Sequence, residues 1–307
     1  MRRRLMGIAT AAVLLGLMGT LPATAADPVK VLGTKADEYS PAASDTYLSW
    51  NVWNGSTNIV YAKPFGGSRV RVSPTGWGGG NGSIDGTTVT YQQYSHKKDV
   101  SDIYRFDLVT RNRTKLPAAI NTKRWEYGPS ASGDILAFAR WLPTNERKLI
   151  VYDAGSGSSR TVATSSGART YLGVGQVSGN WLAYERHAVD NRGRLTSCEV
   201  FLYDIAGRTT SKIPNPNSRC QYSPSVDTVG TVYYARSALA CGVNVVLRAF
   251  PIGGPVSTLT QLAEGKDTVS TYAVDDGGGS ADVYYDQSRC KPDGGFGPGD
   301  IYKVTSP

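Results

Sequence analysis

One phrase occurs three times in this chain. Residues 38–51 read EYSPAASDTYLSWN, residues 126–140 read EYGPSASGDILAFAR and residues 221–236 read QYSPSVDTVGTVYYAR. Each copy has a tyrosine, a Ser-Pro or Gly-Pro pair and small residues, followed by a run rich in apolar residues. A chain that repeats one local pattern in this way is built from repeated structural units, so its architecture must be one that stacks similar modules.

A second, shorter phrase sets the period of these units. It is an extended run of β-branched and aromatic residues, usually ending in Asp, and its copies begin at Asn58, Asp102, Lys148, Glu199, Asn244 and Asp300. Successive copies are 44, 46, 51, 45 and 56 residues apart. A period of this size, with four strands in each unit, is typical of a β-propeller blade.

Residues 126–164 show how one unit divides into four strands. YGPSAS is a short strand of small residues, DILAFAR and KLIVYDA are rich in apolar residues, and SRTVAT is more polar. Turn-forming residues separate these segments, with Asn145 in one loop and a GSGS run from Gly155 in the next. Small residues suit the crowded centre of a propeller, and apolar strands suit the space between neighbouring blades.

The sequence therefore predicts an all-β fold, a six-bladed β-propeller of four-stranded antiparallel blades. The predicted blades span residues 38–74, 81–117, 126–164, 171–214, 221–260 and 268–304. The sixth has no fourth strand of its own, whereas residues 28–33 (PVKVLG) form an extra strand ahead of the first blade. We expect residues 28–33 to complete the last blade and close the ring, which would leave few exposed strand edges. Five or seven blades are the alternative counts.

The N-terminal segment has the pattern of a secretory signal peptide. Arg2, Arg3 and Arg4 precede an apolar stretch, and Ala23-Thr24-Ala25 supplies the small residues that a signal peptidase requires. We predict that residues 1–25 are removed and that residues 26–307 form the propeller; a retained membrane anchor is the alternative. No later stretch is long and apolar enough to span a bilayer. The predicted location is secreted or extracytoplasmic.

Four cysteines lie in the last third of the chain, at Cys198, Cys220, Cys241 and Cys290. An even number in an exported chain predicts two disulfides. Zinc sites usually need close cysteine pairs, and the nearest two here are 21 residues apart. Of the three connectivities, Cys198–Cys220 with Cys241–Cys290 is preferred, because the alternatives must reach across a blade and a disulfide spans only about 4.4–6.8 Å between Cα atoms.

The blade phrases resemble those of TolB-like propellers, in which an S-P-D-G turn precedes an I-A-F strand and a D-I-Y strand. EYGPSASGDILAFAR and DIYRFD match that style, whereas the turn is degraded here to SPAASD, GPSASGD and SPSVDTVG. The resemblance covers nearly the whole chain after the signal segment and implies a propeller fold. TolB itself has a smaller α/β domain ahead of its propeller, and we expect none here, so the resemblance implies no role in the Tol complex.

Charge and motifs favour a protein without catalytic machinery. The net charge is +8, or +5 without the three arginines of the signal segment, and the charges are scattered, so no nucleic-acid partner is expected. No G-x-S-x-G or sialidase motif is present. DDGGGSAD (residues 275–282) is interpreted as a tight turn and GWGGGNG (residues 76–82) as a connection between blades. We therefore expect no cofactor and no bound metal.

One face of the ring is the candidate binding surface. Loops from second to third strands and from blade to blade emerge together, and they carry Trp53, Asn54, Trp77, Tyr94, His96, Lys97, Lys98, Trp141, Arg186 and His187. Exposed tryptophan with cationic side chains suits protein or glycan contacts. The alternative is that these tryptophans only cap blade ends and that the two histidines are ordinary exposed loop residues.

These observations predict an exported, non-catalytic and monomeric propeller that serves as a protein- or glycan-binding or scaffold module, with an unknown partner. The alternative is a divergent propeller enzyme of the polysaccharide lyase or glycosidase type. Its candidate acids at the channel mouth are Glu38, Asp85, Glu126 and Glu185. Two such acids would have to lie within roughly 5–10 Å of each other to act as a pair.

Overall fold

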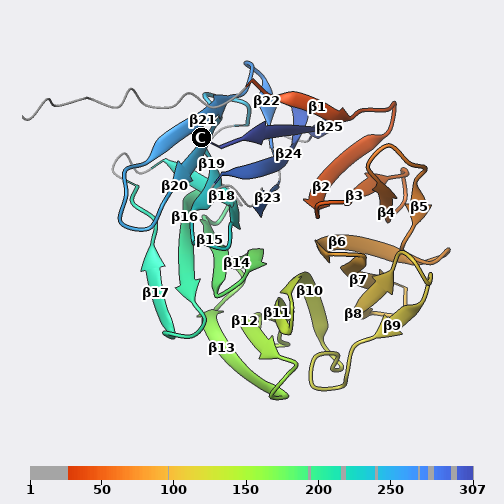
Figure 1. Ribbon diagram of the computed structural model, residues 1–307. Helices are drawn as coiled ribbons and strands as arrows, with labels where there is room; N and C mark the ends of the chain where they lie inside the picture. The colour runs from red at the N-terminus through yellow and green to blue at the C-terminus, as the bar shows by residue number, and fades with distance from the viewer. Residues whose placement is uncertain are drawn as a thin grey trace, which may run out of the picture.

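The computed structural model describes residues 27–95, 97–192, 195–215, 219–238, 241–268, 270–275, 280–291 and 296–306. Within these residues the chain forms 25 β-strands, which surround a central axis as separate sheets (Figure 1). The predicted signal peptide, residues 1–25, lies outside the described residues and stays a prediction. In the part of the chain that the structure describes, no helix has the length and apolar character needed to cross a membrane.

The first three blades follow one another along the chain. Blade 1 contains β2 (Asp37–Ala43), β3 (Tyr47–Trp53), β4 (Asn58–Pro64) and β5 (Val70–Arg71). Blade 2 contains β6 (Gly78–Asp85), β7 (Thr88–Ser95), β8 (Val100–Asp107) and β9 (Arg113–Lys115). Blade 3 contains β10 (Trp125–Ser132), β11 (Ile135–Trp141), β12 (Arg147–Asp153) and β13 (Ser158–Ser165). One parallel residue pair between β8 and β10 joins blades 2 and 3.

The last three blades complete the ring. Blade 4 contains β14 (Thr170–Ser178), β15 (Trp181–Val189), β16 (Leu195–Asp204) and β17 (Thr209–Lys212). Blade 5 contains β18 (Cys220–Val226), β19 (Val232–Ser237), β20 (Val246–Phe250) and β21 (Ser257–Gln261). Blade 6 contains β23 (Thr271–Asp275), β24 (Ala281–Cys290), β25 (Phe296–Thr305) and β1 (Val29–Leu32), with β22 (Lys266–Asp267) paired to the end of β24. The described strands thus form the six antiparallel blades predicted from the sequence.

The ring is closed by the N-terminal strand, as predicted. β1 pairs antiparallel with β25, with Lys30 opposite Tyr302, and Figure 1 shows these first and last strands side by side in blade 6. The Lys30 ammonium lies 2.7 Å from the Asp300 carboxylate. Val31 and Leu32 pack against the apolar core shared with blade 1. An outer strand taken from the N-terminus therefore joins the last blade to the first.

The core lies between the blades, where the second strand of every blade contributes a large buried aromatic side chain. These side chains are Trp50, Tyr91, Phe138, Tyr184, Tyr234 and Tyr285. They occupy equivalent positions in β3, β7, β11, β15, β19 and β24. β19 and β24 contribute a second one, Tyr233 and Tyr284. The apolar middle strands therefore stabilise the ring by packing blade against blade.

The repeated phrase forms the inner strands β2, β10 and β18. In its three copies the residue before proline has a left-handed backbone, with φ of 51° at Ser40, 56° at Gly128 and 52° at Ser223. The antiparallel pairing of the inner strand with the second strand shifts its register at the same place in each copy. The preceding tyrosines are half-buried. Tyr127 donates a hydrogen bond to the Leu172 carbonyl of the next blade, and desolvation raises its pKa to about 12.

The blades between these copies carry a glycine where the proline of the next blade approaches. A Cβ on Gly82 would lie 2.0 Å from the Pro129 carbonyl oxygen, and one on Gly175 would lie 2.2 Å from the Pro224 carbonyl oxygen. From blade 1 to blade 5 the inner strands therefore alternate between proline-bearing and glycine-bearing, whereas β23 of blade 6 has neither residue. The glycine run at residues 78–80, predicted as a connection, also begins an inner strand, β6.

We expect Gly175→Ala to lower the free energy of unfolding by about 1–3 kcal/mol, because the added methyl group overlaps backbone that cannot move freely. Gly155→Ala is the matched control, since its Cβ would meet only side-chain atoms, the nearest 3.3 Å away. Urea unfolding of both variants measures the difference. Equal stability of the two variants would show that the close approach has no energetic consequence.

Candidate functional site

Side chains span the centre of the ring. The Gln176 amide in blade 4 donates to the Ala273 carbonyl at 2.7 Å and accepts from the Ala273 N–H at 2.8 Å in blade 6. The Tyr272 hydroxyl donates to the Ile84 carbonyl of blade 2 at 3.3 Å. Cavities of about 360 and 170 Å³ are both lined by Tyr272, which therefore lies between them. The channel is blocked by an aromatic ring and an amide.

Two of the four candidate channel acids are buried away from these cavities. Glu38 and Glu126 are fully buried, and each accepts a hydrogen bond from the hydroxyl of a threonine four residues earlier, Thr34 at 2.7 Å and Thr122 at 2.6 Å. Arg140 also lies 2.8 Å from Glu126. Burial nevertheless raises the pKa of Glu126. Both carboxylates lie near the start of an inner strand, where they bind the residues that precede it. The prediction that they lie at the channel mouth is therefore wrong for these two acids.

The other two acids line different cavities. Asp85 lines the larger cavity, where it accepts a hydrogen bond from the Gly133 N–H at 2.7 Å. Glu185 lines the smaller one and accepts from the Ser223 N–H at 2.6 Å. The sequence analysis missed Asp275, which lines the same mouth as Asp85 and accepts from a backbone N–H of blade 5. Each of these carboxylates accepts a hydrogen bond from the backbone of a neighbouring blade, an arrangement that does not favour the enzyme alternative.

The candidate binding face is assembled at one edge of each blade. Inner strands begin there and second strands end there, so Trp125 lies directly opposite Trp141 and Tyr171 directly opposite His187. The ring of Tyr94 packs on Gly78 in the equivalent position of blade 2. Directly opposite residues point to the same side of a sheet, so their side chains are neighbours.

Aromatic and cationic side chains alternate along this edge from blade 2 to blade 4. Lys98 lies 4.8 Å from the centre of the Trp77 ring. The Arg147 guanidinium lies 4.7 Å from the Trp141 ring and 4.2 Å from the Tyr171 ring. We call the following set the aromatic strip: Trp77, Tyr94, Trp125, Trp141 and Tyr171.

Other members of the predicted face lie apart from the strip. Trp53 is 45% exposed but lines a separate pocket between blades 1 and 6. Arg186 is paired with Glu199 at 2.9 Å. Lys97 is exposed beside Lys98. His96, and residues 276–279 of the acidic-glycine turn, lie outside the described residues.

A cleft of about 550 Å³ opens beside the strip at blade 3. Its lining combines two indole rings with cations and amide or carboxylate oxygens: Asp99, Lys123, Arg124, Trp125, Trp141, Leu142, Pro143 and Asn145. The sequence analysis missed Trp125, Lys123 and Arg124, because they precede the repeated phrase and were not assigned to a loop. Pairing the first residue of the inner strand with the last of the second strand would have placed Trp125 opposite Trp141.

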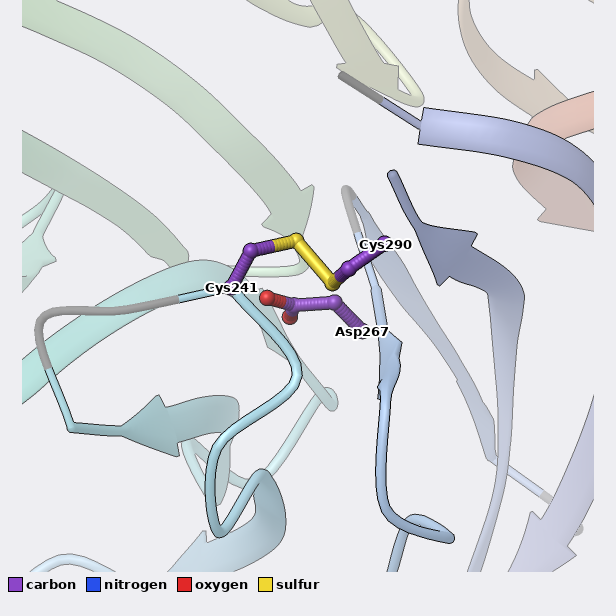
Figure 2. Close-up of side chains that lie close together, drawn as sticks. All are labelled: Cys241, Asp267 and Cys290. Carbon is purple, nitrogen blue, oxygen red and sulfur yellow. A yellow bond between two sulfur atoms is a disulfide. The ribbon is translucent and has the colours of Figure 1, made fainter. Parts of the chain in front are cut away.

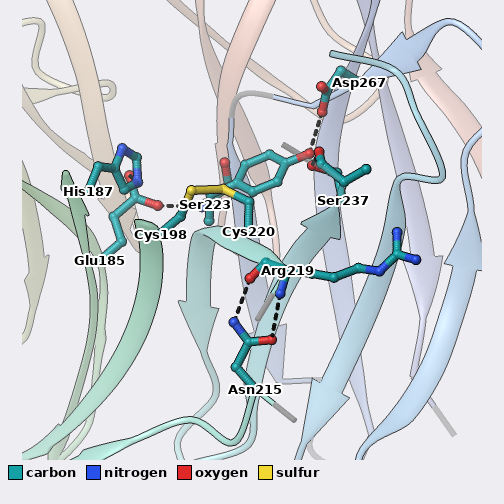
Figure 3. The surroundings of a disulfide bond; sticks show 11 residues. Glu185, His187, Cys198, Asn215, Arg219, Cys220, Ser223, Ser237 and Asp267 are labelled. Atoms are coloured by element: carbon teal, nitrogen blue, oxygen red, sulfur yellow. Dashed lines mark hydrogen bonds and ion pairs between the residues drawn. A yellow bond between two sulfur atoms is a disulfide. The ribbon is translucent and has the colours of Figure 1, made fainter. Parts of the chain in front are cut away.

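Both preferred disulfides are present on this face. Cys198 is bonded to Cys220, with 4.7 Å between their Cα atoms, and Figure 3 shows this bond beside Glu185 and His187. Cys241 is bonded to Cys290, with 5.9 Å between their Cα atoms.

The buried Asp267 carboxylate lies beside the second disulfide (Figure 2). Potential ligand atoms of Cys241, Asp267 and Cys290 lie within 4.8 Å of one another. The two sulfurs are bonded to each other, however, so neither is a thiolate that could ligate zinc. Asp267 instead accepts hydrogen bonds from Tyr222 at 2.5 Å and from the Gly242 N–H at 3.1 Å.

His187 was expected in an exposed loop but lies in β15, with 28% of its side chain exposed. Burial opposes protonation of the imidazole, but the Glu185 carboxylate, 3.3 Å from Nε2, outweighs this and raises the pKa of His187 above 6.5. The stability that protonated His187 gains from Glu185 is therefore present below pH 6.5. It is lost as the pH rises through the pKa of His187 in the folded protein.

We expect an NMR titration to give a midpoint above pH 6.5 for His187, assigned with His187→Gln, and a lower midpoint in Glu185→Gln. A midpoint that does not respond to the Glu185 change would contradict the ion pair.

Solved structures share this fold. The chain superposes on TolB from Acinetobacter baumannii with a TM-score of 0.54 and 16% identity, over 85% of this chain and 64% of that one, so it spans less than two thirds of that protein. A putative TolB from Agrobacterium tumefaciens gives 0.56 and 16%, over 89% and 92% of the two chains. The propeller domain of the Trilobed protease from Pyrococcus furiosus gives 0.51 and 12%, over 89% and 94%.

The solved structures show that the chain has the β-propeller fold of TolB-like proteins, and at these identities they show the fold alone. The Pyrococcus domain is described as having an open velcro topology, whereas β1 and β25 close the ring here. No protein-family model matches the sequence. No curated protein matches it either.

Proposed function

We propose that this protein is an exported, monomeric and non-catalytic binding module that holds its partner on the aromatic strip and in the adjoining cleft. The observation that carries the proposal is the cleft itself, where two tryptophans lie directly opposite each other beside two cations. Aromatic side chains and arginine dominate binding energy at protein surfaces, because they offer large contact area with little loss of entropy.

Location and architecture support this role. Two disulfides are typical of proteins that fold in oxidising compartments, in agreement with the predicted cleavage of a signal peptide after Ala25. A closed ring of packed blades holds surface residues on a rigid frame, which suits a scaffold at the cell envelope or outside the cell. The last blade is completed by β1 of the same chain and not by a strand of a second copy, which supports a monomer.

Binding to the envelope fraction of the cells that make the protein tests the proposal. We expect the wild-type protein to cosediment with that fraction, and Lys123→Glu/Arg124→Glu to bind at least about tenfold more weakly. The control Arg111→Glu/Arg208→Glu makes the same charge change on exposed residues between third and fourth strands, on the opposite face. Absence of wild-type binding, or equal loss in both variants, would contradict the proposal.

A further inference from the structure

We propose that the cleft between Trp125 and Trp141 binds an acidic polysaccharide, a chain that contains hexuronate residues. This inference rests on the proposed function, because it names the ligand of the same site. It depends on three features of the cleft: fixed aromatic rings, cations without acidic partners, and strand edges that are already paired.

The two indole rings are held before any ligand arrives. The Trp125 Nε1–H donates to the Asp99 carboxylate at 2.8 Å, and its ring lies 6.2 Å from that of Tyr94. Trp141 is 43% exposed but is packed against the Arg147 guanidinium on one side. A fixed aromatic face loses little entropy on binding. Its flat surface suits the apolar C–H face of a pyranose ring.

The cations at the cleft select for negative charge. Lys123 and Arg124 are exposed, and among the described residues no carboxylate lies within ion-pair distance of either. Asp99 is the one acid in the cleft lining, and it is engaged with Trp125. A guanidinium binds a carboxylate through two parallel hydrogen bonds, so a uronate complements this site better than a neutral sugar.

The backbone at the cleft favours a glycan over an acidic peptide. Extended peptides commonly bind by adding a strand to a free sheet edge. Here β11 is paired with both β10 and β12, and the end of β10 at the cleft is also paired on both sides, because Trp125 lies opposite Trp141 of β11 and Ser101 of β8. Neither strand therefore offers a free edge at the cleft. The cleft volume of about 550 Å³ lies within the size of ordinary ligand sites, roughly 300–1,000 Å³. It would hold a short segment of a longer chain.

Isothermal titration with defined polymers tests the inference. The acidic glycan probes are polygalacturonate and alginate; dextran is the neutral glycan, and poly-L-glutamate and single-stranded DNA are anions without a pyranose chain. We expect binding to at least one acidic glycan that weakens as salt screens the cations. Trp141→Ala and Lys123→Glu/Arg124→Glu should each weaken it at least about tenfold.

Trp53→Ala is the matched control, because Trp53 ends β3 as Trp141 ends β11 and is almost equally exposed, 45% against 43%. It should bind like the wild type, and circular dichroism checks that every variant is folded. The inference would be overturned if dextran bound as tightly as the acidic glycans, or if neither acidic glycan bound. It would also be overturned if poly-L-glutamate or single-stranded DNA bound as tightly and Trp141→Ala did not weaken that binding. Envelope binding that still depends on Lys123 and Arg124 would then preserve the proposed function with another partner.

Discussion

Deletion of residues 27–33 should lower the midpoint of thermal unfolding by about 5 °C and promote aggregation, since a loss of about 3 kcal/mol of stability corresponds to a shift of that size in a domain this large. The deletion removes β1, so Val31 and Leu32 no longer cover the core shared by blades 6 and 1. It also leaves β25 as an unpaired edge, a template for pairing with other chains. Differential scanning calorimetry and light scattering measure the two effects.

Lys30→Ala is the control for this deletion. It removes the exposed ion pair with Asp300 but leaves the strand in place, so the midpoint should change little. An unchanged midpoint in the deletion variant, with a monodisperse protein, would show that the ring does not depend on β1 for its closure.

Removal of the Cys241–Cys290 disulfide should have the second large effect. Its cysteines are 49 residues apart in sequence, against 22 for Cys198–Cys220. Restriction of the unfolded chain by loops of these lengths corresponds to about 4 and about 3 kcal/mol, respectively. The longer bridge also ties blade 5 to blade 6, the blade that is completed by a strand from the other end of the chain.

We therefore expect Cys241→Ser/Cys290→Ser to lose about 2–4 kcal/mol in urea unfolding at equilibrium. Hydrogen exchange should become faster first in β24 and β25, because these strands lie next to the released bridge. Cys198→Ser/Cys220→Ser is the comparison, and a loss below about 1 kcal/mol in the Cys241 variant would contradict the expected role of that bridge.

The blades could be predicted because strand patterns are local. The run KLIVYD carries its β-branched and aromatic residues within one strand, and spacing alone shows that the run recurs. Ring closure followed from a count, since the last blade lacked a strand and residues 28–33 were left over. The disulfides followed from strand order, which places the four cysteines at one face.

The centre of the ring could not be predicted in this way. Tyr272 and Gln176 contact blades that are not their neighbours, and such contacts depend on the diameter and closure of the whole ring. Glu126 looked like a channel acid because its position in the strand is correct, but the direction of its side chain is set by Arg140 and Thr122.

The cleft was only half predicted for a similar reason. Trp141 ends a second strand and Lys98 follows one, positions that the strand order assigns to one face, whereas Trp125 begins an inner strand. Its place opposite Trp141 depends on the register of β10 with β11, and a ladder that slips between Tyr127 and Ser130 conceals that register in the sequence.

Hydroxyl-radical footprinting of the protein bound to its envelope partner tests the central claim most directly. Trp141 and Trp53 are 43% and 45% exposed, so in the free protein the two rings should be oxidised at similar rates. Binding on the aromatic strip predicts strong protection of Trp141 in the complex and unchanged oxidation of Trp53. Protection of Trp53 with unchanged oxidation of Trp141 would place the partner elsewhere and contradict the account.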